Sequence, residues 1–167
     1  IDTQMKLPAV ASTKVDWGGN LKSSSTMTRS EDYTENGNIN SSMAVGDTLS
    51  EQNTIYDDWG NEYTFSVEYE KTAADTYDMT YELTDEDGNS VVGPTTSEVV
   101  FDANGDMSTI GGVAADSINI TDTTKGIDFD FDPTAVTQLA SSNTLSSSVD
   151  ENRVPTVVSG TVTMYDS

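Results

Sequence analysis

Two neighbouring segments of this 167-residue chain alternate strictly between apolar and polar side chains, and this period of two constrains the fold most. The alternation covers residues 62–71 and 77–84, and a third run covers residues 127–132. Successive side chains of a β-strand point to opposite faces, so each run predicts a half-buried strand. The short connector 72–76 predicts an antiparallel hairpin between the first two. We expect a core of Phe65, Val67, Tyr69, Tyr81, Leu83, Phe129 and Phe131, with Glu68, Glu82 and Asp130 exposed.

Turn residues punctuate the chain between these and weaker strands. The segments 57–61, 85–89 and 102–106 each carry Gly beside Asn or Asp, residues that tolerate the positive φ of hairpin turns. The weaker strands are predicted at residues 53–56, 97–101, 107–110, 117–121 and 158–164. Strands at this spacing predict an all-β fold, either an antiparallel β-barrel or a sandwich.

One segment carries the pattern of a helix. Asp132 can cap a helix, Pro133 suits its first position, and Ala135, Val136 and Leu139 form a short apolar stripe. The sequence therefore predicts one short helix near residues 133–140, followed by a polar connector. Residues 23–52 are mostly polar, and they predict either a long surface loop or one weak strand around residues 39–45.

The composition excludes several classes of function. The chain has 29 acidic and 7 basic side chains, a formal net charge of −22, and neither Cys nor His. Nucleic acid and anionic membrane surfaces would repel such a chain. Without Cys or His it has no thiol nucleophile, zinc-finger site or Ser-His-Asp triad. No run approaches the roughly 18 apolar residues of a membrane-spanning helix, and both ends of the sequence are those expected of an excised fragment.

Three patterns invite a chemical interpretation, and each has a simpler structural one. The turn containing Asp85, Asp87 and Asn89 offers calcium-type oxygen ligands, but its flanks are strands, which favours a solvated hairpin turn. The row Asp128, Asp130 and Asp132 has the carboxylate spacing of a glycosidase, but an acidic strand face that opposes aggregation explains it better. Trp17 and Trp59 could stack on a sugar, whereas most tyrosines lie at core positions. We therefore predict no catalytic, cofactor-binding or metal-binding residues, and no cofactor.

Five blocks, in order, resemble the flagellar hook protein family. Residues 54–61 are similar to its strand ending in Val-Tyr-Asp-Ser-Leu-Gly-Asn, and residues 63–72 to the alternating aromatic strand that follows. Residues 99–106 resemble its Asp/Asn-x-Asn-Gly hairpin, residues 131–142 its Leu-Thr-Gln-Phe-Ala-Ser segment, and residues 20–23 its Asn-Leu-x-Ser strand. The chain departs from the family at Trp59, where an aliphatic residue is usual, at Pro133, and in residues 25–52, which have no counterpart.

The resemblance implies a structural protein rather than an enzyme. A hook subunit assembles with identical copies into a helical tube, a universal joint that transmits torque from basal body to filament. It reaches the bacterial flagellum through type III export. The fragment would hold a linker or edge of a neighbouring domain at 1–12, a main outer-layer β-domain at 13–142, and a connector and returning strand at 143–167. Alone, it is expected to be a monomer. Rod and hook-cap proteins, and a cell-surface adhesin or carbohydrate-binding β-module, are the alternatives.

Overall fold

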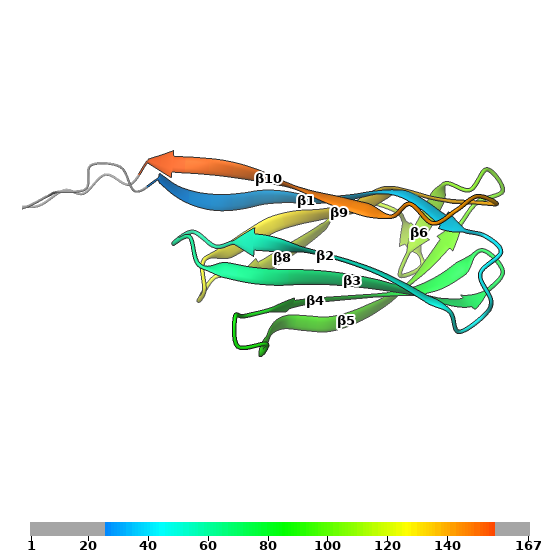
Figure 1. Ribbon diagram of the computed structural model, residues 1–167, viewed down its shortest axis with the longest axis horizontal. Coiled ribbons are helices and arrows are strands. Elements are labelled where there is room, and N and C mark those ends of the chain that lie inside the picture. Colours follow the sequence, from blue (N-terminus) through cyan, green and yellow to red (C-terminus); the bar gives the residue numbers. More distant parts are fainter. Residues whose placement is uncertain (1–25, 156–167) are drawn as a thin grey trace, which may run out of the picture.

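The computed structural model describes residues 26–155, which form a sandwich of two β-sheets (Figure 1). The four-stranded sheet has the order β10 (Ser146–Pro155), β1 (Thr26–Asn40), β9 (Ile127–Leu139) and β8 (Ile118–Asp122). The six-stranded sheet has the order β2 (Thr48–Tyr56), β3 (Glu62–Ala73), β4 (Thr76–Thr84), β5 (Ser90–Phe101), β6 (Met107–Ile110) and β7 (Val113–Ala114). The all-β prediction is confirmed as a sandwich, and neither sheet closes into a barrel.

The chain enters and leaves the sandwich at one end. The first residue of β1, Thr26, pairs with the last residue of β10, Pro155, and the two strands run antiparallel from there. The pairing of β1 with β9 is parallel, whereas the other strand pairs are antiparallel. The turn between β2 and β3 lies at this same end, because the Arg29 guanidinium near the start of β1 contacts Asp58.

The core lies between the sheets and is rich in aromatic rings. Phe65 packs edge-on against Tyr33, Phe129 and Phe131, with ring centroids 4.8, 5.2 and 5.2 Å apart. Edge-to-face ring pairs contribute stability beyond that gained by burying apolar surface. All seven predicted core residues are buried, and Glu68 and Asp130 are exposed as predicted, while Glu82 is half-buried. The alternation along β3 and β4 therefore identified the correct inner face.

Three hairpin turns share one construction, Asp-x-x-Gly-x. In the turns that begin at Asp57, Asp85 and Asp102, a carboxylate oxygen accepts hydrogen bonds from the backbone N–H groups two and four residues later, at 2.8–3.1 Å. The glycine at the fourth position has a φ of 79–85° in each turn. A residue with a Cβ would be strained there, so the predicted turn chemistry is confirmed.

The predicted helix at 133–140 is wrong, because β9 continues through it to Leu139. Pro133 lies where the register between β1 and β9 shifts, so its missing N–H falls at an irregularity in the ladder. The Asp132 carboxylate accepts a hydrogen bond from the Thr134 amide at 2.9 Å. This hydrogen bond stabilises the bulge rather than a helix N-terminus. The shift moves the buried positions from Phe131 and Pro133 to Val136 and Gln138. Of the predicted apolar stripe only Val136 is buried, whereas Ala135 and Leu139 are exposed.

Residues 23–52 are neither a long loop nor a single strand at 39–45. They contain all of β1, a turn, and the first half of β2. Their periodicity is hidden because β1 buries polar side chains, Ser30, Glu35 and Asn38, beside Tyr33 and Ile39. The Asn38 amide donates to the carbonyls of the loop after β9, at 3.2–3.3 Å, so a buried polar residue ties the two segments together. The strand predicted at 158–164 lies outside the described residues.

Candidate functional site

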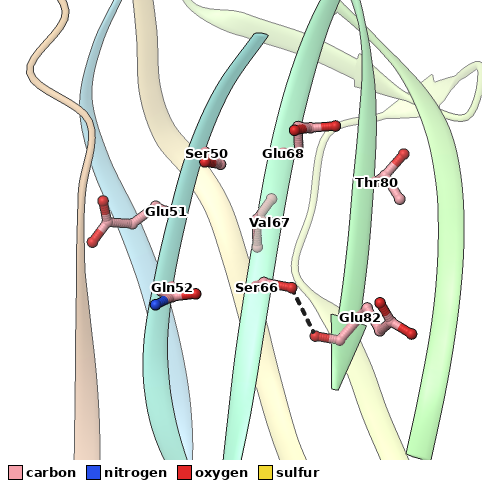
Figure 2. Close-up of a pocket in the computed structure, with 8 residues that line it drawn as sticks. All are labelled: Ser50, Glu51, Gln52, Ser66, Val67, Glu68, Thr80 and Glu82. Atoms are coloured by element: carbon pink, nitrogen blue, oxygen red, sulfur yellow. Dashed lines mark hydrogen bonds between the residues drawn. The ribbon is translucent and has the colours of Figure 1, made fainter. Parts of the chain in front are cut away.

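The outer face of the six-stranded sheet is entirely polar where β2, β3 and β4 run side by side. A shallow hollow of about 590 Å³ lies on it, and the side chains that line it include Ser50, Gln52, Ser66, Glu68, Thr80 and Glu82 (Figure 2). Further along this face, Glu70, Asp78 and Glu98 occupy directly opposed positions on β3, β4 and β5. Like charges opposite one another destabilise a sheet, so this row does not serve stability.

The outer face of the four-stranded sheet repeats this arrangement. Asp150, Asp32 and Asp130 are in register across β10, β1 and β9. A second shallow hollow, of about 620 Å³, is lined by Asp32, Thr34, Asp132, Ser148, Val149 and Asp150. The sandwich therefore presents an acidic row on each of its two outer surfaces.

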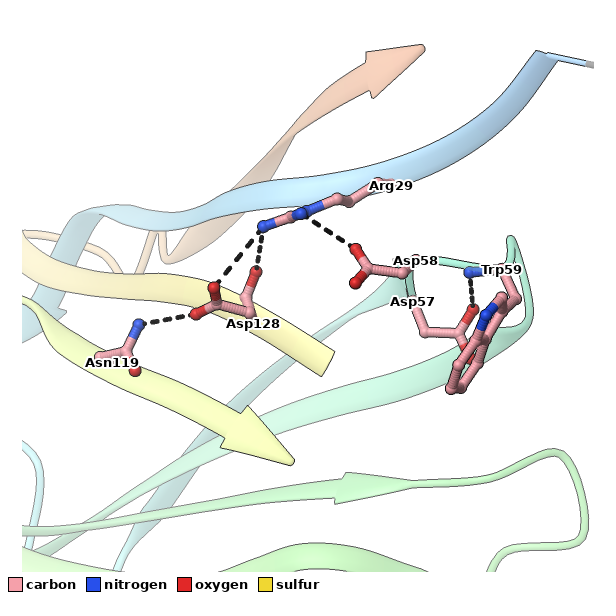
Figure 3. A network of polar contacts seen from close by, with 6 residues as sticks. All are labelled: Arg29, Asp57, Asp58, Trp59, Asn119 and Asp128. Atoms are coloured by element: carbon pink, nitrogen blue, oxygen red, sulfur yellow. Dashed lines mark hydrogen bonds and ion pairs between the residues drawn. The ribbon is translucent and has the colours of Figure 1, made fainter. Parts of the chain in front are cut away.

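Among the side chains that the structure describes, no basic one neutralises these rows. Among residues 28–151, whose side chains are described, the basic residues are Arg29, Lys71 and Lys125. Lys71 is buried and donates to the Ser41 carbonyl. Arg29 pairs with Asp58 at 2.9 Å and with Asp128 at 3.6 Å, at one end of the sandwich (Figure 3). Each acidic row therefore consists of carboxylates without a basic member.

The structure gives four of the candidate carboxylates, those of Asp85, Asp128, Asp130 and Asp132, a local partner. The Asp85 carboxylate accepts hydrogen bonds from the backbone of its own turn. These hydrogen bonds lower the pKa of Asp85 below its usual value, and the one from the Asn89 backbone has the largest effect. The Asn119 amide donates to Asp128 at 3.1 Å and to Asp130 at 3.0 Å, and Asp132 accepts from Thr134. Within residues 26–155 there is no group of three or more acidic side chains arranged to hold a metal ion.

Trp59 protrudes from a rigid turn. Trp59 is 55% exposed. Asp57 beneath it is 1% exposed and accepts from the backbone amides of Trp59 and Asn61 and from the Tyr63 hydroxyl. The Asp58 amide also donates to the Gly126 carbonyl at 2.9 Å. The tyrosines predicted for the core, Tyr63, Tyr69, Tyr77 and Tyr81, are buried, and Trp17 lies outside the described residues.

A buried carboxyl group, Glu35, escaped sequence reasoning. Glu35 is 0% exposed, its Oε2 accepts a 2.6 Å hydrogen bond from the Tyr69 hydroxyl, and its Oε1 has no hydrogen-bond partner in the structure. Burial, reinforced by the nearby charge of Glu51, raises the pKa of Glu35 to about 7. The only signal in the sequence is that Glu35 lies two residues after Tyr33, on the same face of β1.

Comparison with known proteins decides the family. Residues 20–152 match the family described as the flagellar basal body protein FlaE D2 domain. The chain belongs to this family. The match confirms the resemblance to flagellar hook proteins drawn from the sequence blocks. No curated protein matches the sequence significantly.

A solved structure supports the fold assigned to this FlaE D2-domain chain. The sandwich is similar to part of the flagellar hook protein FlgE2 of Helicobacter pylori, with 20% sequence identity and a TM-score of 0.51. The similarity covers 64% of this chain and 25% of that protein, so the chain corresponds to about a quarter of the relative's length. The described residues, 26–155, also contain no helix that is long and apolar enough to cross a membrane.

Proposed function

We propose that this chain is an outer-layer domain of a flagellar hook subunit. The subunit assembles with identical copies into a helical tube that acts as a universal joint between basal body and filament. The family match over residues 20–152 carries this proposal. Type III export would bring the subunit to the hook. The boundaries expected from sequence are 1–12, 13–142 and 143–167, and the pairing of β10 with β1 favours extending the main domain through residue 155. Its role is mechanical, and we assign it no catalysis and no cofactor.

The two acidic faces support a role in sliding contacts between neighbouring subunits. As a joint bends, its outer domains move past one another, which requires contacts that form and break easily. Large apolar patches would fix such domains in place, whereas small wet polar contacts permit movement. The rows Glu70–Asp78–Glu98 and Asp150–Asp32–Asp130 keep identical faces from adhering, at a cost to the sheet itself.

Immunogold electron microscopy of the source bacterium tests this proposal. An antibody raised against residues 26–155 should decorate the short curved hook between cell and filament. Cells that produce the subunit without residues 26–155 serve as the matched control and should lose the label. Gold particles spread over the cell surface and absent from hooks would instead indicate an adhesin or sugar-binding module.

A further inference from the structure

The seam where the edge strands of the two sheets meet is held by polar side chains. Strands β2 and β10 each pair on one side only, and they lie next to one another across the sandwich. Ser147 of β10 joins them, because its hydroxyl donates to Glu51 at 3.2 Å and accepts from the Asn53 amide at 3.4 Å. The Tyr56 backbone N–H also donates to the Ser30 hydroxyl of β1 at 3.0 Å. Within residues 26–155 the seam therefore closes through side chains and not through a backbone ladder.

Glu35 lies beside this seam, between the two sheets. It is paired with Ser147 in the register of β1 and β10, so the two side chains point to the same face. Glu35 is fully buried, and only one of its carboxyl oxygens, held by the Tyr69 hydroxyl at 2.6 Å, makes a hydrogen bond. The buried Tyr33 hydroxyl, on the same strand, also has no hydrogen-bond partner in the structure. Removing an ionised carboxylate from water without partners is costly, so this site suits Glu35 as a neutral acid.

The titratable groups that act on Glu35 come from three strands. Tyr33 lies on β1 itself, Glu51 approaches from β2, and Tyr69 approaches from β3. The neighbouring residues of β10 and β9 are uncharged, and they are Ser147, Pro133 and Thr134. The basic side chains among residues 28–151 make their contacts elsewhere. Loss of the Glu35 proton would therefore create a second negative charge near Glu51, with no described cation to balance it.

We propose that the seam between β2 and β10 is a proton-controlled latch, which is closed while Glu35 is protonated and loosens when Glu35 ionises. Opening lets water reach the carboxylate and moves it away from the charge of Glu51. Because β2 and β10 are edge strands, loosening also gives a neighbouring chain more access to their unpaired backbone groups. The latch therefore makes one side of the sandwich more available for contacts as the pH rises. The inference does not depend on the proposed role in the hook.

Hydrogen–deuterium exchange of the full 167-residue chain, measured by mass spectrometry, tests the latch. The pKa of Glu35 is about 7 while the seam is closed, and it returns toward the ordinary value of 4.5 once water reaches the group. The exchange rate of amides in residues 48–56 and 146–150, divided by the intrinsic rate, should therefore rise by up to about 25-fold between pH 5.5 and pH 8. Exchange in these segments should depend little on dilute urea, because a local opening exposes little surface.

Three variants separate the latch from general effects of pH. Glu35→Gln cannot ionise and should remove the rise, whereas Glu68→Gln, on the exposed outer face of β3, should retain it. Glu51→Gln removes a charge that raises the pKa of Glu35, so its rise should be smaller and should level off at a lower pH. A rise of equal size in Glu35→Gln and the parent would overturn the proposal. Exchange of both segments with the same urea dependence as β4 would overturn it as well, because only global unfolding would then expose them.

Discussion

Replacing Glu35 with glutamine should change how the stability of the sandwich depends on pH. Glu35 lies between the sheets, 0% exposed, with only the Tyr69 hydroxyl bonded to its carboxyl group. Its pKa is about 7 in the folded chain and 4.5 without the fold. Below pH 4.5 the group is protonated in both states, so its favourable contribution is fully present. As pH rises toward 7, the unfolded chain loses the proton first, and that contribution to folding is lost.

The size of this effect follows from the shift in pKa. A difference of about 2.5 units corresponds to about 3 kcal/mol once the pH exceeds 7, and about 2.5 kcal/mol of it develops between pH 5 and 8. Glu35→Gln stays neutral throughout and keeps an oxygen that can accept from Tyr69. The free energy of unfolding of the variant, minus that of the parent, should therefore increase by about 2.5 kcal/mol across this range.

Urea unfolding at several pH values between 5 and 8, followed by circular dichroism, measures this difference. Subtracting the parent removes the repulsion among the other carboxylates, which both proteins share. Glu68→Gln is the matched control, because it makes the same chemical change on an exposed outer face, and its difference from the parent should stay nearly constant. A Glu35→Gln difference that is equally flat would refute the assignment of a buried, proton-binding carboxyl group.

Three further predictions concern packing, backbone and metal. Phe65→Ala should lower the free energy of unfolding by about 3–5 kcal/mol in urea unfolding, since Phe65 packs against three core rings; an unchanged value would contradict the core assignment. Gly37→Ala should cost at least about 2 kcal/mol, because φ is 103° and a Cβ would collide with the Thr144 carbonyl. Gly88→Ala, with a similar φ but open space, should cost only about 1 kcal/mol, and equal losses would count against the collision. Millimolar calcium should raise the melting temperature no more than another salt of equal ionic strength; a large calcium-specific rise would restore the metal interpretation of the Asp85 turn.

The regular hairpin was readable from sequence because local and tertiary preferences agree there. Strands β3 and β4 alternate without interruption, and the Asp-x-x-Gly-x turns carry their own hydrogen-bonding carboxylates. Burial then follows from period two alone. The polar outer face of the six-stranded sheet could be predicted for the same reason, since it is the other half of that alternation.

The four-stranded sheet was harder to predict because its strands break their own period. In β1 the register shifts at Ser30 and again at Thr34, and Glu35 and Asn38 are buried although both are polar. In β9 the bulge at Pro133 changes which face each residue occupies. Both irregularities depend on partners about a hundred residues away, so no local pattern signals them.

The two features that matter most for the surface and the pH response also arise from tertiary contacts. Glu35 becomes a proton-binding group because the packing of the two sheets buries it, and Trp59 stays exposed because Gly126 and Asp57 hold its turn in place. The sequence shows these residues as one glutamate among many acids and one aromatic in a turn. Their environment is set by segments that are distant along the chain.

Sedimentation velocity across protein concentration and salt tests the central claim, that contacts between outer domains are weak and acidic. The chain should sediment as a monomer at low salt, where its net charge of −22 makes copies repel. At high salt, where the Debye length is shorter than about 8 Å, it should self-associate only weakly. Within a tube the high effective concentration of neighbouring domains would still allow such contacts to form. A tight dimer at low salt, or tubes formed by this chain alone, would contradict the account.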